Sequence, residues 1–203
     1  YDLGGFYNTG YIGNEERPNI EDYLSSVQMG LWMPLSRAHG KTPREPWQYG
    51  DMALKEVKKW INFRHRLVPY LYHTACQTHQ SGIPMIRPLV MEYPKDPIAK
   101  IQNLSYMLGD ALLISPGFDR DEYELYLPEG RWQDIESKEV YEGMTFVHIE
   151  NKAFADGGTS LRVFQKEGTS IPLFAQKEVL HVPAQLWKQE DLEFMTFQKK
   201  DVD

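Results

Sequence analysis

The sequence predicts two successive parts of different fold class, an α/β part followed by an all-β part. Three observations support this division. Apolar residues recur with a helical period of about 3.6 until Gly82 and with a period of two after it. The second part also has short β-branched or aromatic stretches between turn-forming sequences such as YPKDP, PEG and DGG. The 203 residues, of which 41% are hydrophobic, suffice for one or two globular domains.

A first helix is predicted over Asn19–Leu31. Its apolar residues fall on one face, at the spacing of an amphipathic helix. Glu21 and Asp22 stand in its first turn, where the helix dipole favours negative charge. Pro34 follows and should prevent the helix from continuing. A polar and aromatic loop is expected after it.

A second and longer helix is predicted over Asp51–Gln80, with Asp51 as the N-cap. Apolar residues keep the helical period along this whole stretch. Pro69 lies inside the pattern and should kink the helix near Arg66. Gly82, followed by a proline, should end it.

The part after Gly82 is predicted to form an antiparallel β-sandwich, because several short strands follow one another between turns. An acidic run, Asp119–Glu124, is interpreted as a solvated turn between two strands and not as a pair of catalytic carboxylates. The stretch from residue 176 to 203 has no clear period. The predicted strands lie in MIRPLVMEY, DALLIS, YELYL, RWQDI, TFVHI and SLRVFQ.

Composition narrows the possible functions. The net charge is −7 and no long basic run is present, which argues against nucleic acid as a partner. A single cysteine, Cys76, excludes a disulfide scaffold and a cysteine metal site, and favours a cytoplasmic location. We expect Cys76 to be a small buried hydrophobe of the second helix. No apolar stretch approaches the roughly 20 residues of a membrane span.

The first 50 residues hold the candidate site residues. Asp2 precedes two glycines, as carboxylates do at strand ends in α/β barrels, although an aspartate can also cap its own turn. His39 also precedes a glycine, and a neutral imidazole can both donate to and accept from a hydroxyl. The alternative for His39 is a surface histidine. The local sequence pattern alone does not decide between the two interpretations of either residue.

The sequence TPREPW places two charged residues beside an aromatic ring. Such a group can form the floor of a sugar site, because an indole can stack on the apolar face of a pyranose. A structural function is the interpretation we favour. We therefore expect Arg44, Glu45 and Trp47 to support a pocket and not to bind substrate directly.

Eight short motifs together resemble family 31 of the glycoside hydrolases, the α-glucosidases and α-xylosidases. Each motif alone is weak, but their common order and spacing are specific, and they extend over most of the chain. The motifs are DLGGF, RAHG, REPW, PYLY, PMIRPL, YPKD, GDALLISP and YLPEGRW.

The resemblance implies that residues 1–82 form the last two βα units of a (β/α)8 barrel and residues 83–175 the sandwich beside it. Residues 176–203 would be a tail or the start of a further domain. It also implies substrate-binding functions for three residues near the amino terminus and a loop-bracing function for Arg37. The implied substrate-binding residues are Asp2, Phe6 and His39.

Members of the family are retaining enzymes that need no metal or organic cofactor. Their two catalytic aspartates lie upstream of the DxGGF motif, so the resemblance implies that this chain carries no catalytic residue and is inactive alone. Its implied partners are an α-glucoside or α-xyloside oligosaccharide and the preceding part of the barrel, in a full enzyme that can also form homo-oligomers. We therefore expect the last portion of a longer glycosidase.

A different class of function also remains open. The chain can be a stand-alone carbohydrate-binding or structural β-sandwich module without catalysis. Trp132 and Tyr141 would then offer a surface on which a sugar stacks. The even, core-like patterning of the strands argues against this alternative.

Overall fold

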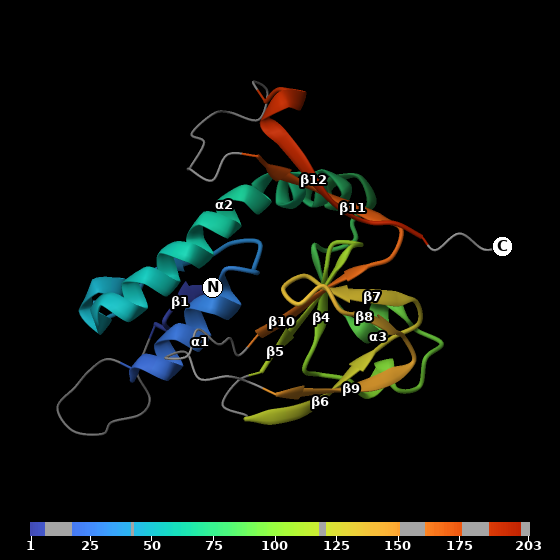
Figure 1. Ribbon diagram of the computed structural model, residues 1–203, viewed down its shortest axis with the longest axis horizontal. Helices are drawn as coiled ribbons and strands as arrows, with labels where there is room; N and C mark the ends of the chain where they lie inside the picture. The colour runs from blue at the N-terminus through green and yellow to red at the C-terminus, as the bar shows by residue number, and fades with distance from the viewer. Residues whose placement is uncertain (7–17, 42, 118–120, 151–160, 176–186, 200–203) are drawn as a thin grey trace.

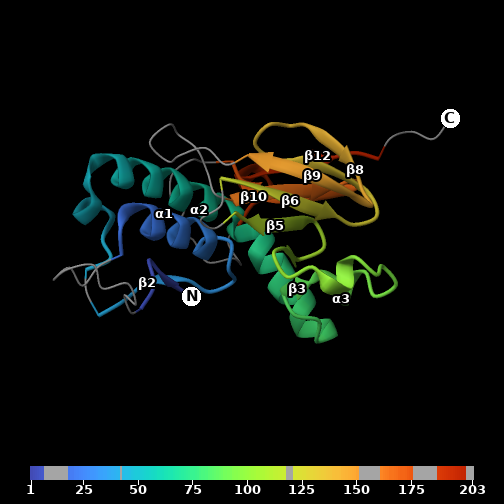
Figure 2. The ribbon, with the colours of Figure 1, turned by 90° about the horizontal axis from the view of Figure 1, so that it is seen from below.

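A computed structural model describes residues 1–6, 18–41, 43–117, 121–150, 161–175 and 187–199 of the chain. Helices α1 and α2 lie side by side next to a short parallel sheet, and antiparallel sheets form the rest of the molecule (Figures 1 and 2). This arrangement confirms the predicted order of an α/β part followed by an all-β part.

The first part is built from two short strands and two helices. Strand β1 (Asp2–Leu3) and strand β2 (Arg37–Ala38) pair in parallel, and helix α1 (Ile20–Gly30) connects them. Parallel strands need such a crossover connection, so β1, α1 and β2 form one βαβ unit. The side chain of Asn19 caps α1 by accepting a hydrogen bond of 2.9 Å from the backbone amide of Asp22.

Helix α2 (Gly50–Ser81) follows a 3₁₀ turn, η1 (Pro46–Tyr49). The predicted N-cap Asp51 is wrong: η1 has already turned the chain, so Asp51 lies within the first helical turn. The helix contains Pro69, and Figure 2 shows its second part turning away from its first, as expected from the missing hydrogen bond at a proline. Gly82 ends the helix in the left-handed conformation, with φ 74°.

The described residues of the all-β part form one large sheet and two ribbons. Six antiparallel strands lie in the order β3-β4-β5-β10-β7-β8, and β6 pairs with β9 and β11 with β12 in two-stranded ribbons. The bounds are β3 (Ile86–Pro88), β4 (Tyr106–Leu108), β5 (Leu112–Pro116), β6 (Glu122–Leu127), β7 (Arg131–Asp134), β8 (Val140–Glu142), β9 (Thr145–Glu150), β10 (Leu161–Lys166), β11 (Thr169–Phe174) and β12 (Leu192–Phe197). Short helical segments are α3 (Leu89–Glu92), η2 (Ala99–Ile101) and η5 (Gln189–Asp191).

Three apolar clusters hold these elements together. One lies between β1, α1 and the first turns of α2, and includes Tyr23, Leu24 and Val57. A second lies within the sandwich, around Trp132 and Phe164. The third joins the two parts of the chain, because it contains residues of α2 as well as of β4, β5, β10 and β11. The second half of α2 therefore belongs to the core of the sandwich.

Several expectations for single residues and segments are wrong. Cys76 is exposed, because it lies on the face of α2 that points away from the sandwich core. The segment MIRPLVMEY forms a strand only up to Pro88 and then the helical turn α3, since a proline cannot donate to a sheet ladder. Glu122 and Glu124 lie on β6 and not in a turn. The sequence also did not indicate β4, β8, β11 and β12 as strands.

The sugar-stacking surface predicted for a stand-alone module is wrong for Trp132. Trp132 is completely buried, and its indole nitrogen donates a 2.8 Å hydrogen bond to the carbonyl of Pro128. The rings of Tyr141 and Phe164 pack in a T-shaped arrangement, with ring centres 5.8 Å apart. Trp132 thus belongs to the sandwich core and offers no face to a ligand.

Candidate functional site

The candidate site lies at the carboxyl ends of the two parallel strands. Asp2 pairs with Arg37 and Leu3 with Ala38 in the sheet, so the residues after Leu3 and Ala38 leave the strands at the same edge. The amide of Lys41 donates to the carbonyl of Phe6 at 3.1 Å and ties the two following loops together. In α/β barrels this edge carries the active site.

An ion pair spans the strands at the base of the site. The Arg37 Nε donates to Asp2 Oδ1 at 2.8 Å, and Arg37 is much more exposed than Asp2. This hydrogen bond from Arg37 is the main cause that lowers the pKa of Asp2 below its usual value. Asp2 is therefore an ionised carboxylate that accepts hydrogen bonds. The loop-bracing function that the resemblance implies for Arg37 stays a prediction.

Phe6 and His39 come together although 33 positions separate them in sequence. Their ring centres lie 5.2 Å apart, with an angle of 35° between the ring planes. Phe6 is half-buried and His39 is exposed, so the imidazole can reach a ligand beside the phenyl ring. An apolar ring and a hydrogen-bonding ring at one edge suit a sugar, which has apolar C–H faces and hydroxyl groups.

Arg44 is buried behind these loops and connects them. Its Nε donates to the carbonyl of Gly5 at 2.9 Å, and its own carbonyl accepts a 2.8 Å hydrogen bond from the hydroxyl of Tyr23 on α1. Tyr23 in turn stacks on Tyr49, with ring centres 3.8 Å apart. Arg44 thus connects the loops that follow β1 and β2 with α1, and its supporting function in a pocket stays a prediction.

Glycines make the close approach of Arg44 possible. A Cβ added to Gly4 would lie 2.9 Å from the Cδ of Arg44, and one added to Gly40 would lie 3.0 Å from its Nε. Sequence reasoning did not identify Gly40 or Tyr23 as part of this arrangement. The glycine directly after His39 was a signal for the first, whereas Tyr23 looked like any core residue of a helix.

Glu45 and Trp47 flank the turn that starts α2. Glu45 precedes the 3₁₀ turn as its cap residue, without a side-chain capping bond. Trp47 is 61% exposed, so its ring adds little packing behind the pocket. Within the described residues, no three histidine, cysteine, aspartate or glutamate side chains are grouped to hold a metal ion. In that same part of the chain no helix has the length and apolar character to cross a membrane.

Fold and site together define the chain as strands and helices of an α/β barrel with the adjoining antiparallel sandwich. Comparisons with known protein families agree. The family model described as "Glycosyl hydrolases family 31 TIM-barrel domain" matches residues 1–74, and that described as "Glycosyl hydrolase family 31 C-terminal domain" matches residues 82–178. The chain belongs to glycosyl hydrolase family 31.

Relatives of known name place the chain within much longer proteins. It is 32% identical to the human "Neutral alpha-glucosidase AB", over 84% of this chain and 18% of that protein. It is 31% identical to the "Alpha-xylosidase" of Saccharolobus solfataricus, over 86% of this chain and 23% of the relative. The chain thus spans less than a quarter of either protein.

A solved structure matches both parts of the chain at once. The cycloalternan-forming enzyme from Listeria monocytogenes, in complex with a pentasaccharide substrate, has a TM-score of 0.80 and 28% sequence identity. The match covers 97% of this chain and 19% of that enzyme. Helices and sandwich therefore share their relative arrangement with this solved enzyme structure.

Proposed function

We propose that this chain supplies the substrate-side part of the active site, and the sandwich that stabilises it, in a retaining α-glycosidase. The enzyme would act on terminal α-linked glucosyl or xylosyl residues of oligosaccharides. The observation that carries this proposal is the meeting of Phe6 and His39, 5.2 Å apart, at the carboxyl ends of two parallel strands. The names of the relatives, an α-glucosidase and an α-xylosidase, support this substrate class.

The chemistry of this class limits what Asp2 can do. Retaining hydrolysis uses two carboxyl groups about 5–5.5 Å apart, one as nucleophile and one as general acid. Asp2 is held ionised by Arg37, so it suits accepting a hydrogen bond from a sugar hydroxyl and does not suit donating a proton. We place both catalytic carboxyls in another part of the barrel, and we expect the 203-residue chain alone to be inactive.

His39 and Phe6 would then position the sugar that is cleaved. The imidazole would hold a hydroxyl, and the phenyl ring would cover an apolar C–H face. As the ring distorts towards the oxocarbenium-like transition state, the hydrogen bonds to its hydroxyls tighten, which lowers the barrier. The ion pair between Asp2 and Arg37 would keep the polar edge of the site charged and fixed in place.

A pair of assays tests this function. The 203-residue chain should not hydrolyse aryl α-glucosides or aryl α-xylosides. In the enzyme with a complete barrel, His39→Ala should lower kcat/KM roughly 10–100-fold, the value of one strong hydrogen bond, while the melting temperature stays unchanged.

The matched control is His73→Ala, which removes an exposed histidine of α2 outside the site. It should leave kcat/KM unchanged. Turnover by the isolated chain would contradict the placement of the catalytic carboxyls elsewhere. Equal activity of the two histidine variants would contradict the function assigned to His39.

A further inference from the structure

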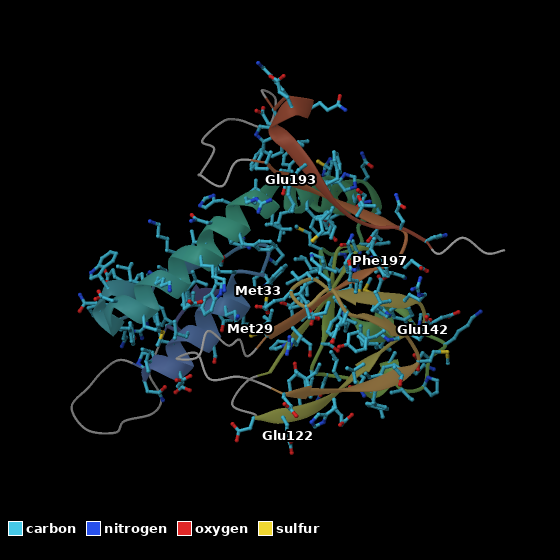
Figure 3. The ribbon with its side chains drawn as sticks, viewed as in Figure 1. Met29, Met33, Glu122, Glu142, Glu193 and Phe197 are labelled. Carbon is cyan, nitrogen blue, oxygen red and sulfur yellow. The ribbon has the colours of Figure 1, made fainter. Side chains whose placement is uncertain are left out.

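A cavity of about 460 Å³ lies between the end of α1, the middle of α2 and the sandwich. Trp32, Trp60 and Phe63 line it from the helical side, and Ile135 and Val163 line it from the sandwich. It lies near the end of α1 marked by Met29 and Met33 in Figure 3. Its volume falls within the range of small-molecule sites in proteins, about 300–1,000 Å³.

The cavity is distinct from the candidate active site. Helix α1 runs back past β1, so Leu31 and Trp32 at its end lie towards the amino-terminal ends of the strands. Phe6 and His39 follow the carboxyl ends of the same strands. A ligand in the cavity would therefore contact neither of them.

Hydrogen bonds from two arginines fix the walls of the cavity. Arg64 donates to the carbonyls of Leu31 and Pro34, the latter at 3.1 Å, which ties α2 to the end of α1. Arg66 donates to the carbonyl of Phe174 at 3.0 Å and pairs with Glu193, which ties α2 to the β11–β12 ribbon. Walls held in this way form a site that needs little rearrangement to bind a ligand.

The cationic side chains of the cavity lining already make polar contacts. Lys59 pairs with Glu56 at 3.7 Å, and Arg162 pairs with Asp134 at 3.5 Å. Arg66 pairs with Glu193, and Arg64 donates to two backbone carbonyls. An anionic ligand would have to compete with the carboxylates bound to Lys59, Arg66 and Arg162, so the lining favours a neutral ligand.

Asn62 and Glu136 of the lining have hydrogen-bonding capacity left, and so does the buried Nε of Arg162. For the Asn62 amide and the Glu136 carboxylate the structure gives no side-chain hydrogen bond to any described residue. An amide both donates and accepts, as a row of hydroxyl groups requires, and a carboxylate accepts. Aromatic rings beside such groups offer flat apolar faces. Hydroxyl edges and apolar C–H faces occur together in a pyranose ring.

We propose that this cavity is a second sugar site, which binds a pyranose unit of a short neutral oligosaccharide away from the catalytic centre. The site would hold a glycan chain on the enzyme without cleaving it. The inference does not depend on the function of His39 or Asp2, because none of the residues that carry it belongs to the strand-end site.

Calorimetric titration of the 203-residue chain with maltotriose and with isomaltotriose tests the proposal. At least one sugar should bind saturably, with a Kd of about 1 mM. Asn62→Ala should weaken binding about fivefold at an unchanged melting temperature, since it removes one hydrogen-bonding group from a half-buried position. Trp60→Ala should weaken it further.

Matched control variants separate the cavity from other surfaces. Asn103→Ala and Trp47→Ala change exposed residues of the same types outside the cavity and should leave binding intact. His39→Ala should also leave it intact. Absence of saturable binding for both sugars would overturn the proposal. So would binding that survives Asn62→Ala and Trp60→Ala, or binding that His39→Ala abolishes, since the sugar would then occupy another site.

Discussion

At the scale of single residues, the candidate site depends on its glycines as much as on its side chains. Because glycine has no side chain, neighbouring groups can approach its backbone closely. Gly4 has a φ of 78° and lies against the ring of Tyr23, only 2.8 Å from the position a Cβ would need. This close packing brings the loop of Phe6 against α1 and leaves room for Arg44 between the two loops. The first glycine of the DLGGF motif therefore meets a packing requirement.

Gly4→Ala should destabilise the chain more than the same change at Gly82. Both glycines have a left-handed φ, 78° and 74°, so alanine costs about 1–2 kcal/mol of backbone strain at either position. Nothing lies within 4 Å of a Cβ on Gly82, whereas Gly4 adds a clash worth about 1–3 kcal/mol. Urea unfolding of both variants measures the difference. Equal losses of unfolding free energy would mean that the loop moves aside without cost.

At the scale of elements, the β6–β9 ribbon carries an unfavourable charge pattern with a built-in compensation. Glu122 and Glu150 are direct partners across the ribbon, and like charges at such positions repel. His148 lies between them on the same face, and its Nδ1 is 2.9 Å from Glu124 Oε1. The hydrogen bond to Glu124 is the main cause that raises the pKa of His148 above its usual value.

His148 should make the stability of the chain depend on pH. A raised pKa in the folded state means that protonation stabilises the fold. This contribution is complete below about pH 6.5, the unfolded value, and is lost as the pH rises through the folded pKa. Melting curves at several pH values should show His148→Gln removing part of the fall in melting temperature above pH 6.5. His73→Gln, which lies outside the ribbon, should leave the dependence of the melting temperature on pH unchanged. The same pH dependence in both variants and the unchanged chain would contradict the contribution of His148.

The elements also show which parts of the fold the sequence could predict. Helices α1 and α2 were predictable, because each buries one stripe of residues over many turns and has clear end signals in Asn19 and Gly82. Strands β8 and β11 were not predictable. They have only three and six residues beside turns, which is too short for a clear alternation of apolar and polar residues. Strand β12 was not predictable because only Phe197 of its six residues is buried.

At the scale of the whole molecule, one apolar cluster unites the helical part and the sandwich. Leu67, Tyr70 and Leu71 of α2 share it with Ile114 and Val163 of the large sheet. The hydroxyl of Tyr70 donates to the carbonyl of Leu108 at 2.6 Å, and burial raises the pKa of that hydroxyl to about 12, so it stays protonated at neutral pH. The two parts should therefore unfold together.

Tyr70→Phe should weaken both parts of the molecule at once. The change leaves the carbonyl of Leu108 and the amide of Ala111 without their hydroxyl partner, at a cost of about 1–3 kcal/mol. For a chain of this length that lowers the melting temperature by roughly 2–4 °C per kcal/mol. Far-ultraviolet dichroism follows α2, and the fluorescence of the buried Trp132 contributes a signal from the sandwich. Two separated transitions, or a shift in only one signal, would contradict a shared core.

The arrangement of the whole molecule explains why the sequence could indicate one site and not the other. Phe6 and His39 stand in short motifs at the ends of consecutive strands, and the chain order of a βαβ unit brings such residues together. The cavity is different, because Phe63 and Val163 meet across it only when α2 packs on the sandwich. The local sequence near either residue does not predict that contact, so it becomes visible only in the folded chain.

The kinked helix α2 has a consequence for how such enzymes can change in evolution and in the laboratory. Its first turns pack under the barrel strands, and its later turns are part of the sandwich interior. A crossover at Gly82 would join one parent's helix to another parent's sandwich and mismatch the interlocking surfaces around Tyr70. Recombination between family members at the apparent border after α2 should therefore lower the stability of the hybrid chain.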